Sequence, residues 1–126
     1  MSSCGATGAV SSSVYKILAA AEWHAAMAAG VFVGSAVDKR DGYIHLSTAA
    51  QVRETAARHF AGQSDLVLVA FDDGALGPAL RWEPSRGGAL FPHLYASLDP
   101  RAARWAQPLP LGRDGIHVFP PLDGEA

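Results

Sequence analysis

GYIHLSTAAQ, residues 42–51, is the stretch that decides the fold, because a short strand gives way there to a helix. Side chains of a strand alternate between its two faces. Over residues 43–47 this alternation predicts one face with Tyr43, His45 and Ser47 and an opposite face with two aliphatic side chains. The first face collects ring and hydroxyl groups, so we expect it to border a polar site.

A capping box predicts where the following helix begins. Thr48 and Gln51 have the spacing at which an N-cap residue and the residue three positions later satisfy each other's backbone N–H groups. We expect the helix to run to about Phe60, with Val52 and Ala56 in its apolar line. Two roles are open to Thr48, a cap or a contact to an anion at the helix start, and we favour the cap.

The rest of the chain is expected to add more strands than helices. The apolar run LVLVAF predicts a central strand covered on both faces. The expected elements are a helix over residues 20–29 and strands over residues 14–18, 31–33, 66–71, 80–83, 90–98 and 115–119. Residues 34–42 and 99–113 are expected to be loops. The predicted fold class is α+β, a mixed and largely antiparallel split sheet with two main helices.

Length and composition indicate one domain. The 126 residues are 49% apolar and 17% charged, which is typical of a folded chain. We expect a flexible tail over residues 1–13, the domain over residues 14–120 and a C-terminal tail over residues 121–126. The single cysteine, Cys4, can form no internal disulfide and has no neighbour that would lower its pKa.

Charge and hydropathy limit the partners. Ten Lys and Arg against twelve Asp and Glu do not make the basic face that binds duplex nucleic acid. No run approaches the roughly 18–20 apolar residues that span a bilayer, so we expect no membrane contact. We therefore expect a cytoplasmic protein with a small-molecule ligand, and the sequence leaves the oligomeric state open.

Residues 80–88, LRWEPSRGG, form a second candidate region. Arg81 and Glu83 share one face of a strand, and Arg86 precedes two glycines whose backbone can approach a ligand closely. Arginine is a bidentate partner of phosphate or carboxylate, and Glu83 could bind a ribose hydroxyl or act as a base. An internal ion pair of Glu83 with Arg81 or Arg86, holding the loop, is an equally good interpretation.

A third candidate region is LFPHLY, residues 90–95, where Phe91, His93 and Tyr95 share a strand face. This pattern suits a wall that stacks a planar ring with His93 as its polar contact, or an aromatic core layer. His45, Glu83 and His93 could in principle form a two-histidine, one-carboxylate metal set. No metal-ligand motif spacing is present, and we predict no metal.

Together these stretches resemble the "domain of unknown function 952" family. The matching pieces lie within residues 14–98 and include Trp23 with Gly30, DKRDGYIHLST over residues 38–48, LRWE over residues 80–83 and LFPHLY over residues 90–95. That family is thought to resemble the ADP-ribosyltransferase-like fold, in which a split α+β domain grips NAD between two small sheets. The resemblance implies that NAD is a candidate cofactor.

The strand over residues 43–47 is also similar to one in the NAD-dependent RNA 2′-phosphotransferases. This likeness implies that His45 faces a ribose or phosphate, that Glu83 contacts a ribose, and that Tyr43 or Tyr95 is a stacking ring. Asp41 stands about where those enzymes carry an arginine for phosphate, so the likeness does not extend to 2′-phosphotransfer.

The leading hypothesis is a site that binds a nucleotide or another phosphate-bearing small molecule, with transferase activity as a candidate. His45, Glu83 and His93 are the candidate catalytic residues. The candidate ligand-binding residues are Tyr43, Ser47, Thr48, Arg81, Arg86, Phe91 and Tyr95, with Arg86 and the helix start at Thr48 holding the anion. Two alternatives stay open: a non-catalytic interaction module whose polar cluster is structural, and a metal-dependent hydrolase.

Overall fold

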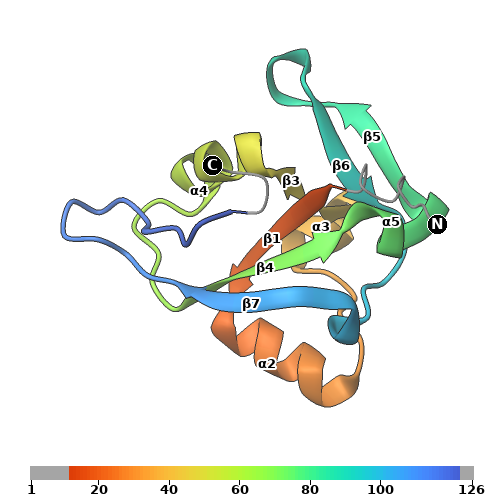
Figure 1. The fold of residues 1–126 in the computed structure, drawn as a ribbon, viewed down its shortest axis with the longest axis horizontal. Coiled ribbons are helices and arrows are strands. Elements are labelled where there is room, and N and C mark those ends of the chain that lie inside the picture. The colour runs from red at the N-terminus through yellow and green to blue at the C-terminus, as the bar shows by residue number, and fades with distance from the viewer. Residues whose placement is uncertain (1–11, 123–126) are drawn as a thin grey trace, which may run out of the picture.

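The computed structural model describes residues 12–122, in which the strands form two sheets (Figure 1). The four-stranded sheet has the order β3-β1-β4-β7, made by Ser47–Thr48, Ser13–Ala19, Leu66–Asp72 and Ala103–Leu109. The three-stranded sheet has the order β2-β6-β5, made by Ile44–His45, Leu90–Leu94 and Leu80–Pro84. The strand pairs of both sheets are antiparallel. The predicted α+β class with largely antiparallel strands is confirmed.

The helices include the two that the sequence predicts. They are α2 (Ala20–Ala29), α3 (Ala36–Asp41), α4 (Ala49–His59) and the single turn α5 (Asp73–Leu76), with 3-10 turns η1 (Gly77–Ala79), η2 (Arg86–Gly88) and η3 (Pro100–Ala102). At the start of α4 the Thr48 N–H donates to Gln51 Oε1 at 3.0 Å, so the capping box is confirmed. Among residues 12–122 no helix is long and apolar enough to cross a membrane.

The four-stranded sheet carries hydrophobic clusters on both of its faces. Alternate residues of β1 and β4 join Trp23 and Ala26 of α2 in one cluster, which also takes in Ile44 and Leu94 from the second sheet. The other residues of these strands join Val52 of α4 in a second cluster. Because β4 is central and covered on both sides, its residues from Leu66 to Phe71 are all buried, as the apolar run predicts.

The strand predicted over residues 43–47 is divided. Ile44 and His45 pair with β6 in the three-stranded sheet, whereas Ser47 and Thr48 pair with β1 in the four-stranded sheet. Leu46 lies between the two strands, and its N–H donates to the Pro92 carbonyl at 3.1 Å. The chain thus crosses between sheets here, and Ser47 does not share a strand face with His45.

The loop predicted over residues 34–42 is wrong, because it contains α3. A capping box between Ser35 and Asp38 starts this helix, and Gly42 ends it at φ +90°, a backbone conformation that glycine adopts readily. Asp38 is almost completely buried. Six residues are too few to show a helical period, so only the cap spacing could have revealed the helix.

The C-terminal third also differs from the prediction. Residues 99–113 were expected to be a loop but contain β7, an edge strand that pairs along β4 and tolerates Pro108. The strand expected over residues 115–119 is absent, and a single bridge joins Leu111 to His117. Strand β6 ends at Leu94, short of the predicted residue 98.

Two residues near the ends of the described chain belong to the fold. Ser13, placed in the N-terminal tail, belongs to β1, and Leu122, placed in the C-terminal tail, is buried in the second hydrophobic cluster. Cys4 and the rest of residues 1–11 and 123–126 lie outside the described residues.

Candidate functional site

Four aromatic rings from β2, β6 and their flanks meet beside the three-stranded sheet. His45 and His93 are direct neighbours across β2 and β6. The Tyr43 ring stacks on His93 with 4.1 Å between centroids and also contacts His45 at 4.6 Å and Tyr95 at 5.2 Å. We call Tyr43, His45, His93 and Tyr95 the ring cluster. Alternation along residues 43–45 and 93–95 places all four side chains on one face of the sheet.

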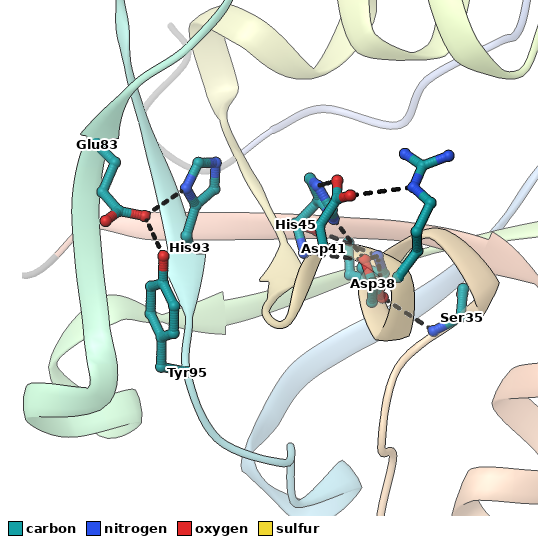
Figure 2. Close-up of polar contacts among 9 residues, drawn as sticks. Ser35, Asp38, Asp41, His45, Glu83, His93 and Tyr95 are labelled. Carbon is teal, nitrogen blue, oxygen red and sulfur yellow. Dashed lines mark hydrogen bonds and ion pairs between the residues drawn. The ribbon is translucent and has the colours of Figure 1, made fainter.

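Strand β5 brings a carboxylate to one side of the ring cluster (Figure 2). Glu83 Oε1 lies 2.8 Å from His93 Nδ1, and the Tyr95 hydroxyl donates to the same oxygen at 2.7 Å. The His93 side chain is buried, while the Glu83 side chain is about one-third exposed. Arg81 lies with its guanidinium carbon 5.0 Å from the centre of the Tyr95 ring.

These contacts set the charge state of Glu83. The hydrogen bond from His93, followed by that from Tyr95, lowers the pKa of Glu83 below its ordinary value of 4.5. The same bond raises the pKa of the Tyr95 hydroxyl, because the carboxylate stabilises the protonated phenol. Among the side chains that the structure describes, which do not include that of Arg86, the hydrogen bonds to this carboxylate end on Oε1. Its Oε2 can therefore accept a hydrogen bond from a ligand.

On the other side of the ring cluster, His45 lies between two aspartates (Figure 2). Its Nδ1 is 2.7 Å from Asp38 Oδ1, and its Nε2 is 3.0 Å from Asp41 Oδ2. Asp41 also accepts from Arg40 Nε at 3.0 Å, a contact that lowers the pKa of Asp41. A neutral imidazole can donate from only one nitrogen, so Asp38 and Asp41 compete for the proton of His45 unless the ring is charged.

Asp38 is the polar centre of the fold. It accepts from Lys16 Nζ at 2.9 Å, from the Ser35 and His45 backbone N–H groups at 2.9 and 3.1 Å, and from the His45 ring. Burial is the largest influence on the pKa of Asp38 and would raise it, but the hydrogen bond with His45 and the charge of Lys16 outweigh burial and lower it. Burial also lowers the pKa of Lys16, and Asp38 opposes this. We take the charged pair as the form near neutral pH, because four donors converge on the carboxylate.

A hollow of about 380 Å³ lies next to the ring cluster. Tyr43, Tyr95, Asp38, Lys39 and Ser97 are among the residues that line it. It is open to solvent and has both aromatic and charged groups in its wall, which is typical of a site for a small polar ligand.

The structure brings together six of the residues that the sequence singled out. Tyr43, His45, Arg81, Glu83, His93 and Tyr95 lie in or against the ring cluster. Arg86 lies in η2, at the turn between β5 and β6, and its side chain is outside what the structure describes.

Three other predicted ligand-binding residues are buried or make contacts within the fold. Ser47 is buried and its hydroxyl bonds the Thr55 hydroxyl at 2.9 Å, because the crossing between sheets carries it away from the ring cluster. Thr48 caps α4, the role that the sequence favoured. Phe91 is buried, so it offers no open wall to a ligand, and Tyr43 lies at the hollow instead.

Sequence reasoning missed Lys16 and Asp38 and gave Asp41 no contact to His45. Two signals were present. Lys16 interrupts the apolar strand VYKIL, where a charged side chain needs a buried partner. Asp38 follows Ser35 at capping-box spacing. Neither signal alone reveals that the two side chains meet across 22 residues of sequence.

The residues considered as metal ligands do not form a metal set. Within the described part of the chain, no group of three or more His, Cys, Asp and Glu side chains is arranged to hold a metal ion. The polar groups of His45, Glu83 and His93 instead bond Asp38, Asp41 and one another.

The fold and the site define a small α+β domain of two antiparallel sheets with a histidine–tyrosine cluster flanked by carboxylates. The chain belongs to the family described as "Protein of unknown function (DUF952)", whose profile matches residues 17–106. An X-ray crystal structure of protein CC0527 from Caulobacter crescentus is similar, with 52% identity, a TM-score of 0.82 and coverage of 84% of this chain and 93% of that one. A solution NMR structure of CC0527 has 53% identity, a TM-score of 0.75 and coverage of 82% and 90%. No curated protein matches the chain.

Proposed function

We propose that the ring cluster, Glu83 and the neighbouring hollow bind a nucleotide or a similar phosphate-bearing small molecule of the NAD or ADP-ribose type. The observation that carries the proposal is the state of Glu83. Its carboxylate is fixed by His93 and Tyr95 through one oxygen and remains partly exposed beside two tyrosine rings. A fixed carboxylate with a spare oxygen is a good acceptor for a ribose hydroxyl.

Residues around the ring cluster and the hollow are suited to contact the base and the phosphates of such a ligand. Tyr43 and Tyr95 line the hollow and present rings on which a base can stack. Arg81 lies on the Tyr95 ring and Lys39 lines the hollow, so both supply positive charge for phosphate. These two residues take the anion-binding role that the sequence gave to Thr48, and Arg86 stays a candidate for it.

The enzymatic form of this proposal is a transferase that uses an NAD-type donor. In it, Glu83 contacts the ribose that is transferred and His93 fixes the orientation of that carboxylate. His45, held by Asp38, is the group available for proton transfer at the opposite end of the ring cluster.

A titration followed by ¹H–¹⁵N NMR tests the proposal with NAD, ADP-ribose and AMP, and inorganic phosphate serves as a control for simple anion binding. We expect saturable shifts at Tyr43, Glu83 and Tyr95 with the nucleotides. The proposal is wrong if none of these signals moves at millimolar nucleotide, or if phosphate alone reproduces all of the shifts.

A second candidate is a non-catalytic interaction module whose polar cluster only organises the fold. One observation favours it: among residues 12–122 every buried side-chain nitrogen and oxygen has a hydrogen-bond partner. His45→Ala discriminates between the candidates. A large loss of stability with unchanged nucleotide titration favours the module, whereas a stable variant that no longer binds nucleotide favours the binding site.

A further inference from the structure

We propose that two copies of the chain pair through the outer edge of β5, joining their three-stranded sheets, and that Arg81 of each copy then reaches Glu83 of the other. The pairing itself does not depend on the proposed function. Its consequence for ligand binding does, because Glu83 belongs to the proposed site.

The outer edge of β5 is open. In the order β2-β6-β5, no strand within residues 12–122 pairs with that edge. The β5–β6 hairpin projects away from the four-stranded sheet (Figure 1). Trp82 on β5 is 41% exposed and Leu90 on β6 is 52% exposed, so the end of the hairpin carries apolar surface. Long open edges with apolar side chains are ready to pair with another strand.

The backbone of Trp82 points to this open edge. The Ser85 N–H donates inward to the Ala89 carbonyl of the same hairpin at 2.9 Å. Backbone groups alternate in direction along a strand, so Glu83 and Arg81 also point inward and Trp82 points outward. Trp82 is opposite Pro92. The Pro92 carbonyl points away from β5, because it accepts from the Leu46 N–H on the other side of β6. This agrees with Trp82 making no hydrogen bond to Pro92.

Leu80 and Pro84 are the other residues of β5 whose backbone groups point to the open edge, and they limit the register in which a second strand can pair. The Leu80 N–H already donates to the Gly77 carbonyl, and Pro84 has no N–H. Trp82 is therefore the residue of β5 that offers both a donor and an acceptor to a partner strand. A twofold axis at Trp82 would let the two copies exchange both hydrogen bonds at that residue.

The same register is self-complementary in its side chains. With Trp82 opposite its own copy, Arg81 lies opposite Glu83 of the partner subunit, and this pair occurs twice. Arg81 and Glu83 share one face of β5, while the two Trp82 rings meet on the other face. A twofold axis at Leu80 would place Arg81 opposite an uncharged residue, and an axis at Pro84 would do the same to Glu83. The backbone hydrogen bonds and the side chains on both faces of β5 thus favour the arrangement with the twofold axis at Trp82.

The other long edge of the molecule lacks this complementarity. Strand β7 carries Pro108 inside it, and its pairing with β4 is irregular between Ala70 and Phe71. Arg104 is its one charged residue, so a twofold pairing of β7 would bring two like charges together or place each opposite an uncharged residue. We therefore assign the pairing to β5 and not to β7.

Pairing would complete the proposed ligand site. Glu83 Oε2, which accepts no hydrogen bond within the described residues, has two lone pairs, so it could accept from Arg81 of the partner subunit and from a ribose hydroxyl together. That guanidinium has five donors and can bind the carboxylate and a ligand phosphate together. The second copy would thereby contribute positive charge to a site whose fixed residues include three carboxylates, Asp38, Asp41 and Glu83.

Sedimentation equilibrium of the full chain without ligand tests the pairing. Over concentrations from about 10 µM to about 1 mM, which bracket weak association, we expect the weight-average mass to rise from 13.2 kDa towards twice that value. Amide hydrogen exchange at Trp82 should slow as protein concentration rises, because its N–H becomes bonded. A mass that stays at one chain throughout, with exchange at Trp82 independent of concentration, overturns the proposal.

A charge exchange tests the register. Arg81→Glu and Glu83→Arg should each weaken association by about ten-fold or more, because each places like charges opposite one another. Combining them as Arg81→Glu with Glu83→Arg should restore association. Arg104→Glu on the β7 edge is the matched control and should leave association unchanged. Failure of the combined variant to restore pairing, or loss of pairing in the control, overturns the register. Since no ligand is present, these outcomes are separate from the fate of the nucleotide titration.

Discussion

Two histidine–carboxylate pairs lie side by side in this domain and are built in opposite ways. In the first, the Asp38 side chain is 1% exposed and the His45 side chain 32% exposed. In the second, the Glu83 side chain is 34% exposed and the His93 side chain 5% exposed. The histidines are neighbours across β2 and β6, and Tyr43 contacts both. In the first pair the histidine is the more exposed group, and in the second pair it is the carboxylate.

We interpret this difference as a division of roles, in which Asp38 stabilises the fold and Glu83 belongs to the proposed ligand site. Asp38 accepts from Lys16, Ser35 and His45, so its oxygens are occupied and it joins β1, α3 and β2. Glu83 is held at one oxygen by a buried histidine and can offer the other to a ligand. A buried carboxylate with every partner in place stabilises a fold, whereas an exposed carboxylate on a rigid support can bind.

Removing the charge of Asp38 should produce the largest effect. Asp38→Asn leaves Lys16 buried without its hydrogen-bonded counter-charge, and one buried member of an ion pair left alone typically costs about 3–5 kcal/mol. We expect a loss of that size in the free energy of unfolding measured in urea. Asp41→Asn is the matched control, since Asp41 also contacts His45 but is partly exposed. Equal losses in the two variants would contradict the structural role of Asp38.

The same carboxylate should dominate the acid sensitivity of the domain. The pKa of Asp38 is lower in the folded chain than its ordinary value of 3.8, so the folded state binds the proton less readily than the unfolded state. Its stabilising contribution is then complete above pH 3.8 and is lost as pH falls from there towards the folded pKa. Unfolding curves collected from about pH 5 down to about pH 2 should show this loss in the wild type. If the free energy of unfolding falls with pH as steeply in Asp38→Asn as in the wild type, the acid sensitivity comes from other groups.

The contrast between the pairs also shows what could be predicted from sequence. Strong local signals located α2, α4 and β4, since capping and hydrophobic periods act within a few residues. Alternation along β2, β5 and β6 correctly gathered His45, Glu83 and His93. The division at Leu46 was missed because a strand that changes sheets keeps its alternating pattern.

The failures concern interactions between distant parts of the chain. Strand β7 has an arginine, a proline and little alternation, and it is a strand because β4 offers it an edge. The Lys16–Asp38 pair joins two segments whose contact follows only from the packing of α3 against β1. Local pattern identifies residues with an unusual need for a partner, but the tertiary fold decides which partner they receive.

Neutralising Glu83 should alter binding more than folding. Glu83→Gln keeps the shape of the side chain but removes the charge that a ribose hydroxyl would meet. We expect a loss of stability several-fold smaller than that of Asp38→Asn, together with about a ten-fold loss of nucleotide affinity, as for a hydrogen bond to a charged group. Glu54→Gln on the exposed face of α4 is the control for removing a surface carboxylate. Unchanged affinity in Glu83→Gln would remove Glu83 from the proposed site.

Removing the Tyr95 hydroxyl should give the smallest and most local change. Tyr95→Phe deletes one of the two donors to Glu83 Oε1, and His93 remains as the stronger influence on the carboxylate. The pKa of Glu83 should therefore rise part of the way towards 4.5 and stay below it. Titration of the Glu83 carboxyl carbon by NMR measures this shift, with Tyr43→Phe as the control because Tyr43 contacts Glu83 through no hydrogen bond within the described residues. A pKa that returns fully to 4.5 would show that His93 does not hold the carboxylate, and the second pair would no longer mirror the first.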